Sequence, residues 1–204
     1  MDNLNLEELF NQYKQSVYEL ADKLPQWNSE DKNRVLDSAI SSLFEEAGEI
    51  AGIISKKRIR KDYWNAEEKQ LYDYKEIRQK FIDETSDFLW VFVCSCHCLG
   101  YDSIPNLEHF NDVRKEYEES TTTNFNHILF DLICDITAFH IQASYADGFA
   151  IVSTLHDIAY TFGLFLAALE DKYDITFDVL IKYNLSKLNV RYDSTTGKRL
   201  DGKE

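Results

Sequence analysis

Apolar side chains recur every three or four residues along most of this chain, which is the pattern of amphipathic helices. The first such stretch covers residues 6–24 and stops at Pro25, which cannot continue a helix. The second runs from about residue 31 to residue 57. A third begins near Glu76, becomes apolar on all sides after position 87 and ends at Leu99-Gly100. These spacings predict three long helices in the first half of the chain.

The second half of the chain continues the same pattern. Further helices are expected at residues 107–119, 125–145, 151–173 and 176–189. The basic run Lys56–Lys61 is expected to close the second helix, because cations stabilise the C-terminal end of a helix. The pattern as a whole predicts an all-α helical bundle in a single domain over residues 1–192, followed by a polar C-terminal tail over residues 193–204.

Composition agrees with helices and narrows the range of partners. The 204 residues include only 7 Gly and 2 Pro, which argues against a loop-rich β-sandwich. The net charge of −14 disfavours duplex nucleic acid or an anionic membrane as the main partner. The longest strongly apolar run is read as Phe88–Leu99, shorter than the roughly 20 residues that span a membrane. With a polar start and no signal peptide, the chain is expected to be cytoplasmic.

Three of the four cysteines lie in the short run Cys94-Ser-Cys96-His-Cys98. On a helix Cys94 and Cys98 share a face while Cys96 points elsewhere, which suits one tetrahedral zinc ion poorly. The cysteines are therefore predicted to be small core residues of a buried helix.

Five carboxylates carry the chemistry of this sequence: Glu45-Glu46-x-x-Glu49 on the second predicted helix, and Glu84-x-x-Asp87 on the third. On a helical wheel the first three lie within one arc of about 100°, apart from the apolar stripe. Asp87 stands where the third helix enters the apolar interior, and burying an unpaired carboxylate costs several kcal/mol. A divalent cation would remove that cost.

The residue types favour magnesium, with manganese as an alternative. Mg²⁺ prefers oxygen ligands and retains waters. A di-iron bundle needs Glu-x-x-His motifs, and neither acidic cluster carries a histidine at that spacing. No Gly-rich phosphate loop is present, which excludes a P-loop NTPase.

The second half of the chain contains a faint echo of the first acidic motif. Leu43–Ile50 resembles Leu129–Ile136, and Asp87-Phe88 resembles Asp157-Ile158. On this alignment Asp131, Asp135 and Asp157 keep acidic positions, whereas Leu132 and Thr154 replace Glu46 and Glu84. Either residues 125–173 are a degenerate copy of the active half at residues 43–99, or two amphipathic helices resemble each other by chance.

The acidic motifs resemble those of the MazG-like, all-α nucleoside triphosphate pyrophosphohydrolases, a superfamily that includes the dimeric dUTPases. The resemblance rests on four ordered segments: Asn11-Gln-Tyr13, Phe44–Ile50, Glu84–Trp90 and Asn184–Tyr192. Two departures are clear. Residues 50–83 between the motifs are longer than is usual in the family, and residues 101–153 separate the second motif from the closing segment.

The resemblance implies Mg²⁺-dependent hydrolysis of (d)NTPs to monophosphate and pyrophosphate, for nucleotide-pool cleansing. It implies metal ligands at Glu46, Glu49, Glu84 and Asp87, and a catalytic role for Glu45 and Glu46, with Glu45 as the possible base. Substrate contacts are expected from the last helix and the residue that follows it, namely Asn184, Lys187, Arg191 and Tyr192.

Two other functions stay open at the level of sequence. One is a narrower pyrophosphatase of the same fold, specific for dUTP or dCTP. The other is a catalytically inactive bundle that binds nucleotide or regulates a partner. Because its helices are so apolar, the chain is expected to form a homodimer or a higher homo-oligomer.

Overall fold

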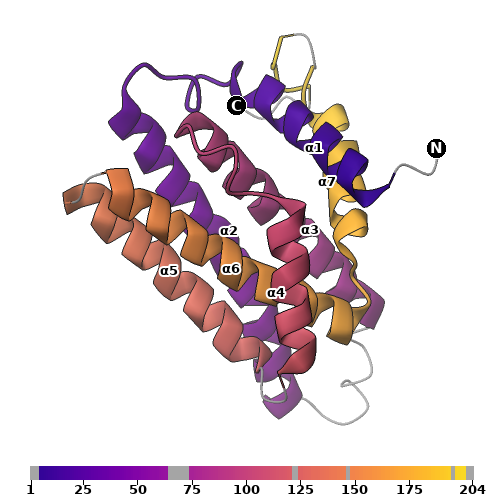
Figure 1. Ribbon diagram of the computed structural model, residues 1–204. Coiled ribbons are helices and arrows are strands. Elements are labelled where there is room, and N and C mark those ends of the chain that lie inside the picture. The colour runs from indigo at the N-terminus through magenta and orange to yellow at the C-terminus, as the bar shows by residue number, and fades with distance from the viewer. Residues whose placement is uncertain (1–4, 64–73, 121–123, 146–147, 194–195, 201–204) are drawn as a thin grey trace.

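The computed structural model describes residues 5–63, 74–120, 124–145, 148–193 and 196–200. Within these ranges the chain forms seven α-helices (Figure 1). In chain order they are α1 (Leu6–Ala21), α2 (Lys32–Tyr63), α3 (Tyr74–Cys98), α4 (Leu107–Glu119), α5 (Phe125–Tyr145), α6 (Gly148–Tyr173) and α7 (Phe177–Arg191). The predicted all-α helical bundle is confirmed.

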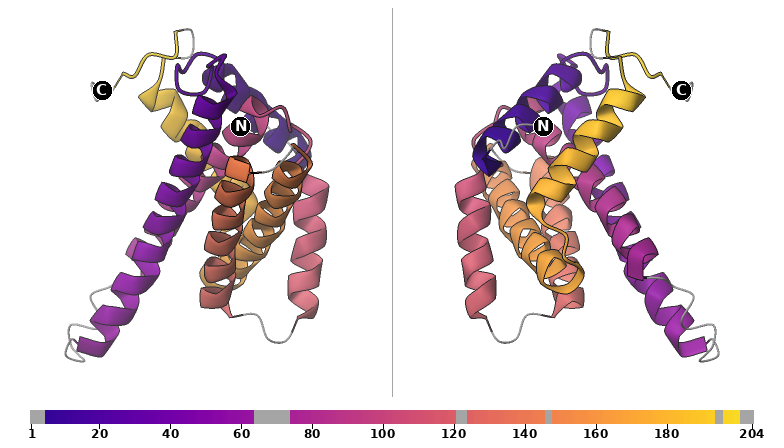
Figure 2. Two further views of the ribbon diagram at one scale, coloured as in Figure 1. Left: turned by 90° about the vertical axis from the view of Figure 1, so that its left-hand side faces the viewer. Right: turned by 90° about the vertical axis from the view of Figure 1, so that its right-hand side faces the viewer.

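Two long antiparallel pairs form the body of the bundle. Helices α2 and α3 make one pair and α5 and α6 the other, with α2 packed on α5 (Figures 1 and 2). Helices α1 and α7 contact each other and α3 at one end, and α4 packs along α6. The distal ends of α2 and α3 diverge from the α5–α6 pair (Figure 2). This arrangement brings α7, the last helix in sequence, against the acidic segment of α3.

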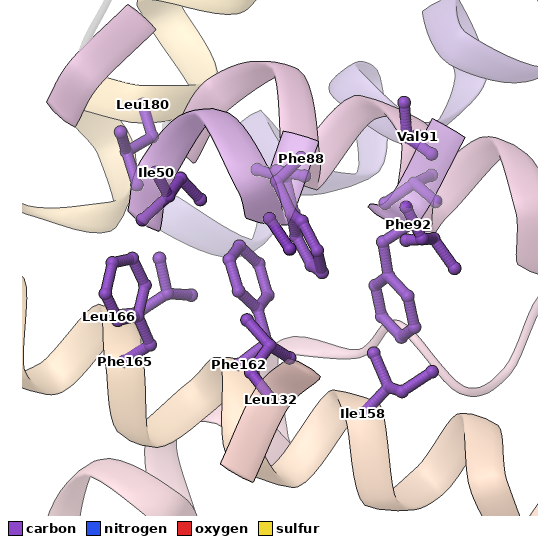
Figure 3. Packing of buried hydrophobic residues seen from close by; sticks show 14 of the residues in the cluster. Ile50, Phe88, Val91, Phe92, Leu132, Ile158, Phe162, Phe165, Leu166 and Leu180 are labelled. Atoms are coloured by element: carbon purple, nitrogen blue, oxygen red, sulfur yellow. The ribbon is translucent and has the colours of Figure 1, made fainter. Parts of the chain in front are cut away.

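The core between the two pairs is aromatic. Phe88 and Phe162 face each other with ring centroids 4.6 Å apart, and Phe92 lies beside them (Figure 3). All three side chains are fully buried. Gly163 lets α4 approach α6 closely, because a Cβ there would lie 3.1 Å from a methyl group of Val113. Close packing of this kind fixes the register of α3, and therefore the position of Asp87 at its edge.

Most predicted helices are present, with changes at their ends. Helices α4 and α5 have the predicted bounds, α1 ends at Ala21 rather than near residue 24, and α6 begins at Gly148 rather than residue 151. The predicted end of the second helix near residue 57 is wrong, because α2 continues to Tyr63, and the basic run Lys56–Lys61 lies within its last turns. The first part of the predicted polar tail folds back, with a β-bridge between Tyr192 and Arg199.

The longest apolar stretch lies in α6 rather than α3. Ala150–Tyr173 is long and apolar enough to cross a membrane by length and composition, with a mean hydropathy of 1.4. Of its most apolar window, 56% is buried inside the bundle. A core helix of a soluble protein passes the same test, so the feature is weak evidence for a membrane span.

Candidate metal and substrate site

The antiparallel pairing of α2 and α3 brings the two acidic motifs together. Oxygens of Glu46, Glu84 and Asp87 all lie within 4.8 Å of one another. Glu49 lies one turn further along α2 and shares a hydrogen bond with Glu84. Three of the four predicted ligands therefore converge from two helices, and the fourth, Glu49, joins them through Glu84. Glu45 lies beside them on the exposed face of α2.

The cluster is electrostatically strained without a cation. Burial raises the pKa of Glu46 to about 8, and the nearby charge of Asp87 adds to the rise. Burial also raises the pKa of Glu84 to about 7, together with the hydrogen bond to Glu49. Protein folds tolerate such shifts mainly where function requires them.

One carboxylate oxygen of the cluster lacks a hydrogen-bond partner among the described residues. Oε2 of Glu46 is buried and has no hydrogen-bond partner among the described residues. Leaving a buried acceptor unsatisfied costs about 1–3 kcal/mol. A hard cation with oxygen ligands would satisfy this atom and offset the repulsion, so the residues present fit Mg²⁺ or Mn²⁺.

Helix α7 supplies the cationic side of the site. The ammonium of Lys187 forms an ion pair with Asp87, and both side chains are mostly buried. Arg191 lies further out, with its Nη1 3.9 Å from the same carboxylate. Asn184 donates a hydrogen bond of 3.3 Å to the other oxygen of Asp87. Three predicted substrate-contacting residues therefore meet the predicted metal ligands.

Tyr192 occupies a different place. It caps the C-terminal end of α7, and its ring lies under the guanidinium of Arg199 at 5.9 Å from the ring centroid. Its described contacts are thus with the C-terminal turn and the hydrophobic core, and none of them involves the acidic cluster. The structure does not bring Tyr192 into the site with the other three residues.

Asn184 locks α7 onto α1 and α3. Its side chain is fully buried, donates to the carbonyl of Ser86 at 2.9 Å and accepts from the hydroxyl of Tyr13 at 3.2 Å. The preceding residue, Tyr183, donates a hydrogen bond from its hydroxyl to Asp83, one turn before Ser86 on α3. These contacts hold Lys187 over Asp87, because Asn184 and Lys187 are three residues apart on one face of α7.

A cleft opens between α2 and α3 beside the carboxylates. Its volume is about 480 Å³. The carboxylates Glu45, Glu49 and Glu84 border it, and the rest of its lining is Phe44, Gly48, Gly52, Ile53, Ile77 and Lys80. Sequence reasoning did not single out Gly52, Ile53, Ile77 or Lys80. Isolated glycines at helical spacing next to the acidic motif were the available signal.

The second half of the chain also brings acidic residues near one another, but Asp131, Asp135 and Asp157 do not form a group of carboxylates close enough to share a metal ion. Burial raises the pKa of Asp135, a hydrogen bond of 2.6 Å from Thr161 opposes the rise, and the charges of Asp157 and Asp131 add to it. Leu132, aligned with Glu46, is fully buried. Among the described residues, the group of three that could hold a metal is in the first half. Whether residues 125–173 are a degenerate copy stays a prediction.

The cysteine run belongs to the core at the far end of α3. Cys94 and Cys96 are buried free thiols and Cys98 is half-buried. Next to them, His97 stacks on Tyr18 and contacts Asp102 at 2.8 Å and Asp22 at 3.3 Å. Burial lowers the pKa of His97, but the hydrogen bonds to these two carboxylates outweigh it and raise the pKa. This cluster could not be predicted from the sequence, because Tyr18 and Asp22 are far along the chain from His97 and Asp102.

No protein-family model, curated protein or solved structure matches this chain.

Proposed function

We propose that this protein is a Mg²⁺-dependent nucleoside triphosphate pyrophosphohydrolase that converts (d)NTPs to monophosphate and pyrophosphate. The proposal rests on the site rather than on the fold, since helical bundles serve many functions. It also agrees with the resemblance of the acidic segments to MazG-like enzymes.

One observation carries the proposal. Three carboxylates within 4.8 Å of one another, including an unsatisfied buried oxygen, stand directly beside a lysine on a neighbouring helix. Carboxylates alone would repel a triphosphate, and cations alone would not hold a metal. Their juxtaposition supports binding of a polyphosphate together with a divalent cation.

Each residue has a role in the proposed reaction. The cation would be held by Glu46, Glu49, Glu84 and Asp87, and when bound it would neutralise phosphate charge and make water a better nucleophile. Lys187 and Arg191 would bind the outer phosphates, and Asn184 would orient Asp87. Glu45, exposed beside the cluster, would accept a proton from water as it attacks the α-phosphorus. The bond from the α-phosphorus to the bridging oxygen breaks, and pyrophosphate leaves.

The test is a nucleotide panel with two product assays. Purified protein is incubated with each (d)NTP and Mg²⁺, and pyrophosphate and orthophosphate are measured separately. We expect pyrophosphate, with none formed when a chelator replaces Mg²⁺. Orthophosphate as the only product would contradict attack at the α-phosphorus.

Two alternatives make different predictions in the same panel. A dUTP- or dCTP-specific pyrophosphatase would release pyrophosphate from that nucleotide and little from the others. A catalytically inactive nucleotide-binding or regulatory bundle would bind nucleotide and release neither product. The intact acidic cluster favours an active enzyme over the inactive bundle.

The setting of the enzyme is part of the proposal. The acidic net charge favours free nucleotides over duplex nucleic acid or a membrane surface, and we place the protein in the cytoplasm. Phe130 and Ile141 of α5 are 64% and 51% exposed, which supports a homodimer or higher oligomer. Light scattering after gel filtration measures the mass and tests this part.

A further inference from the structure

The cleft between α2 and α3 continues the acidic site in one direction. Along α3 the order is Ile77, Lys80, Glu84 and Asp87, and the antiparallel α2 faces it with Ile53, Glu49 and Glu46 in turn. From Ile77 to Asp87 the helix rises on the order of 15 Å. The carboxylates therefore separate two regions, the cleft on one side and the cationic residues of α7 on the other.

The two regions differ in chemistry. Beyond Asp87 stand Lys187 and Arg191, which suit phosphates. The far end of the cleft is built from Ile53 and Ile77, which suit a ring, whereas Phe44 lines the near end beside Glu45. The lysine of the cleft, Lys80, is paired with Glu76 at 3.1 Å. Three carboxylates line the near end of the cleft, and they would repel a phosphate group that is not bound to a metal ion.

Two glycines on α2 keep this cleft open. Gly48 and Gly52 are four residues apart and so share a face of the helix. A Cβ built at either position meets no atom of the described residues within 4 Å. Packing within the chain therefore does not require glycine here, although glycine weakens a helix relative to alanine. The space in front of these glycines is available to a ligand.

We infer that the cleft between α2 and α3 seats the nucleoside of the substrate, with its base against the open Gly48–Gly52 face of α2 and the apolar end formed by Ile53 and Ile77. The inference rests on the proposed function. It gives the substrate a direction: the triphosphate extends from the cleft, past the carboxylates, toward Lys187 and Arg191.

The experiment fills the cleft without touching the carboxylates. Gly52→Leu introduces a side chain into open space on a helix, so the fold is retained. Asn33→Leu, at an exposed position of the same helix roughly 28 Å away, is the matched control. Gly52→Ala, compared with wild type by thermal unfolding, checks that a side chain at this position does not lower the melting temperature.

Binding is measured by calorimetry with Mg²⁺, using the α,β-imido analogues of dATP and dCTP and inorganic tripolyphosphate, which has no nucleoside. We expect Gly52→Leu to weaken both nucleotide analogues at least 10-fold and to change tripolyphosphate affinity less than 2-fold. Asn33→Leu should change neither.

Other outcomes overturn the inference. Equal weakening of nucleotide and tripolyphosphate would place phosphates in the cleft, and unchanged nucleotide affinity would mean that the cleft is not used. The proposed function has a separate test. If wild-type protein binds neither analogue and hydrolyses no (d)NTP, the function fails, whereas hydrolysis by wild type with unaltered binding by Gly52→Leu contradicts only the cleft.

Discussion

Glu46 is the residue at which stability and function conflict most directly. Its carboxylate is partly buried, one oxygen has no hydrogen-bond partner among the described residues, and four other carboxylates raise its pKa along with burial. At neutral pH the folded protein without a cation must either keep a proton on this group or bear the repulsion. A residue in this position is hard to explain by packing alone.

Replacing Glu46 with Gln should therefore separate the two contributions. We expect the metal-free protein at pH 8 to become more stable by about 1–2 kcal/mol, a discounted value because the group is partly solvated. Pyrophosphate release should fall at least 100-fold, because a proposed metal ligand is lost. Urea unfolding with chelator and the product assay measure the two effects. Glu45→Gln is the control for stability and should change it by less than about 0.5 kcal/mol.

Lys187 is predicted to have two roles: it pairs with Asp87 in the free protein and contacts a phosphate group when substrate is bound. Without ligand its ammonium compensates the mostly buried charge of Asp87. Lys187→Gln should destabilise the metal-free protein by about 1–3 kcal/mol, because Asp87 loses its charged partner. Catalytic efficiency should fall roughly 100-fold, because one phosphate contact is lost.

Lys182 provides a matched control on the same helix. It pairs with Asp178 at 2.8 Å across one turn, but both side chains are substantially exposed. Lys182→Gln should cost no more than about 0.5 kcal/mol and leave catalysis unchanged. A similar loss of stability in both variants would mean that the site does not depend on the Lys187–Asp87 pair.

Helix α7 reaches the site through its contacts with α1 and α3. Asn184 is the common point, since it bonds Tyr13 on α1 and Ser86 and Asp87 on α3. Asn184→Ala should cost about 2–4 kcal/mol, because several buried polar groups lose partners together. Tyr13→Phe should cost about 1 kcal/mol.

The double variant tests whether these helices act as one unit. If the Tyr13–Asn184 bond couples α1 to α7, the two losses should differ from additivity by at least 0.5 kcal/mol. Equilibrium unfolding of wild type, both single variants and the double variant gives this coupling energy. Additive losses would show that α1 and α7 are held independently.

The helices were predictable from sequence because their apolar spacing is local. Phe125 and Tyr145, the bounds of α5, follow directly from that spacing. The end of α2 was not predictable, since a basic run suits the last turns of a helix without fixing the last residue. Asp87 was predictable as a site residue because apolar residues follow it immediately.

Contacts between distant segments needed the structure. Asn184 and Lys187 lie about a hundred residues from Asp87, and only the family resemblance pointed to them. Tyr192 was expected in the site on the same ground, but its described contacts are with the C-terminal turn. The cleft was missed because glycines carry no chemistry of their own.

The molecule as a whole has two similar antiparallel pairs, and within the described part of the chain the carboxylate group that could hold a metal lies on the first pair. Fully buried Leu132 takes the position aligned with Glu46, so the second pair contributes packing where the first contributes charge. This division lets α5 and α6 supply the stability that the acidic face of α2 and α3 reduces. The stability of the molecule should therefore depend on the charge state of one pair of helices.

Stability without metal should fall as pH rises. Glu46 and Glu84 have folded-state pKa values of about 8 and 7, above the ordinary value of 4.5. Between the ordinary pKa of these groups and their higher folded-state pKa, the folded state binds more protons than the unfolded state. The free energy of unfolding therefore decreases as the pH rises through this interval. With chelator, the melting temperature should decline from pH 5 to pH 8. Saturating Mg²⁺ at pH 8 should add about 2–3 kcal/mol, or roughly 5–10 °C. Calorimetric scans at each pH, repeated with Glu46→Gln, measure this dependence. A melting temperature of wild type that does not change with pH would mean that folding does not raise the pKa values of Glu46 and Glu84.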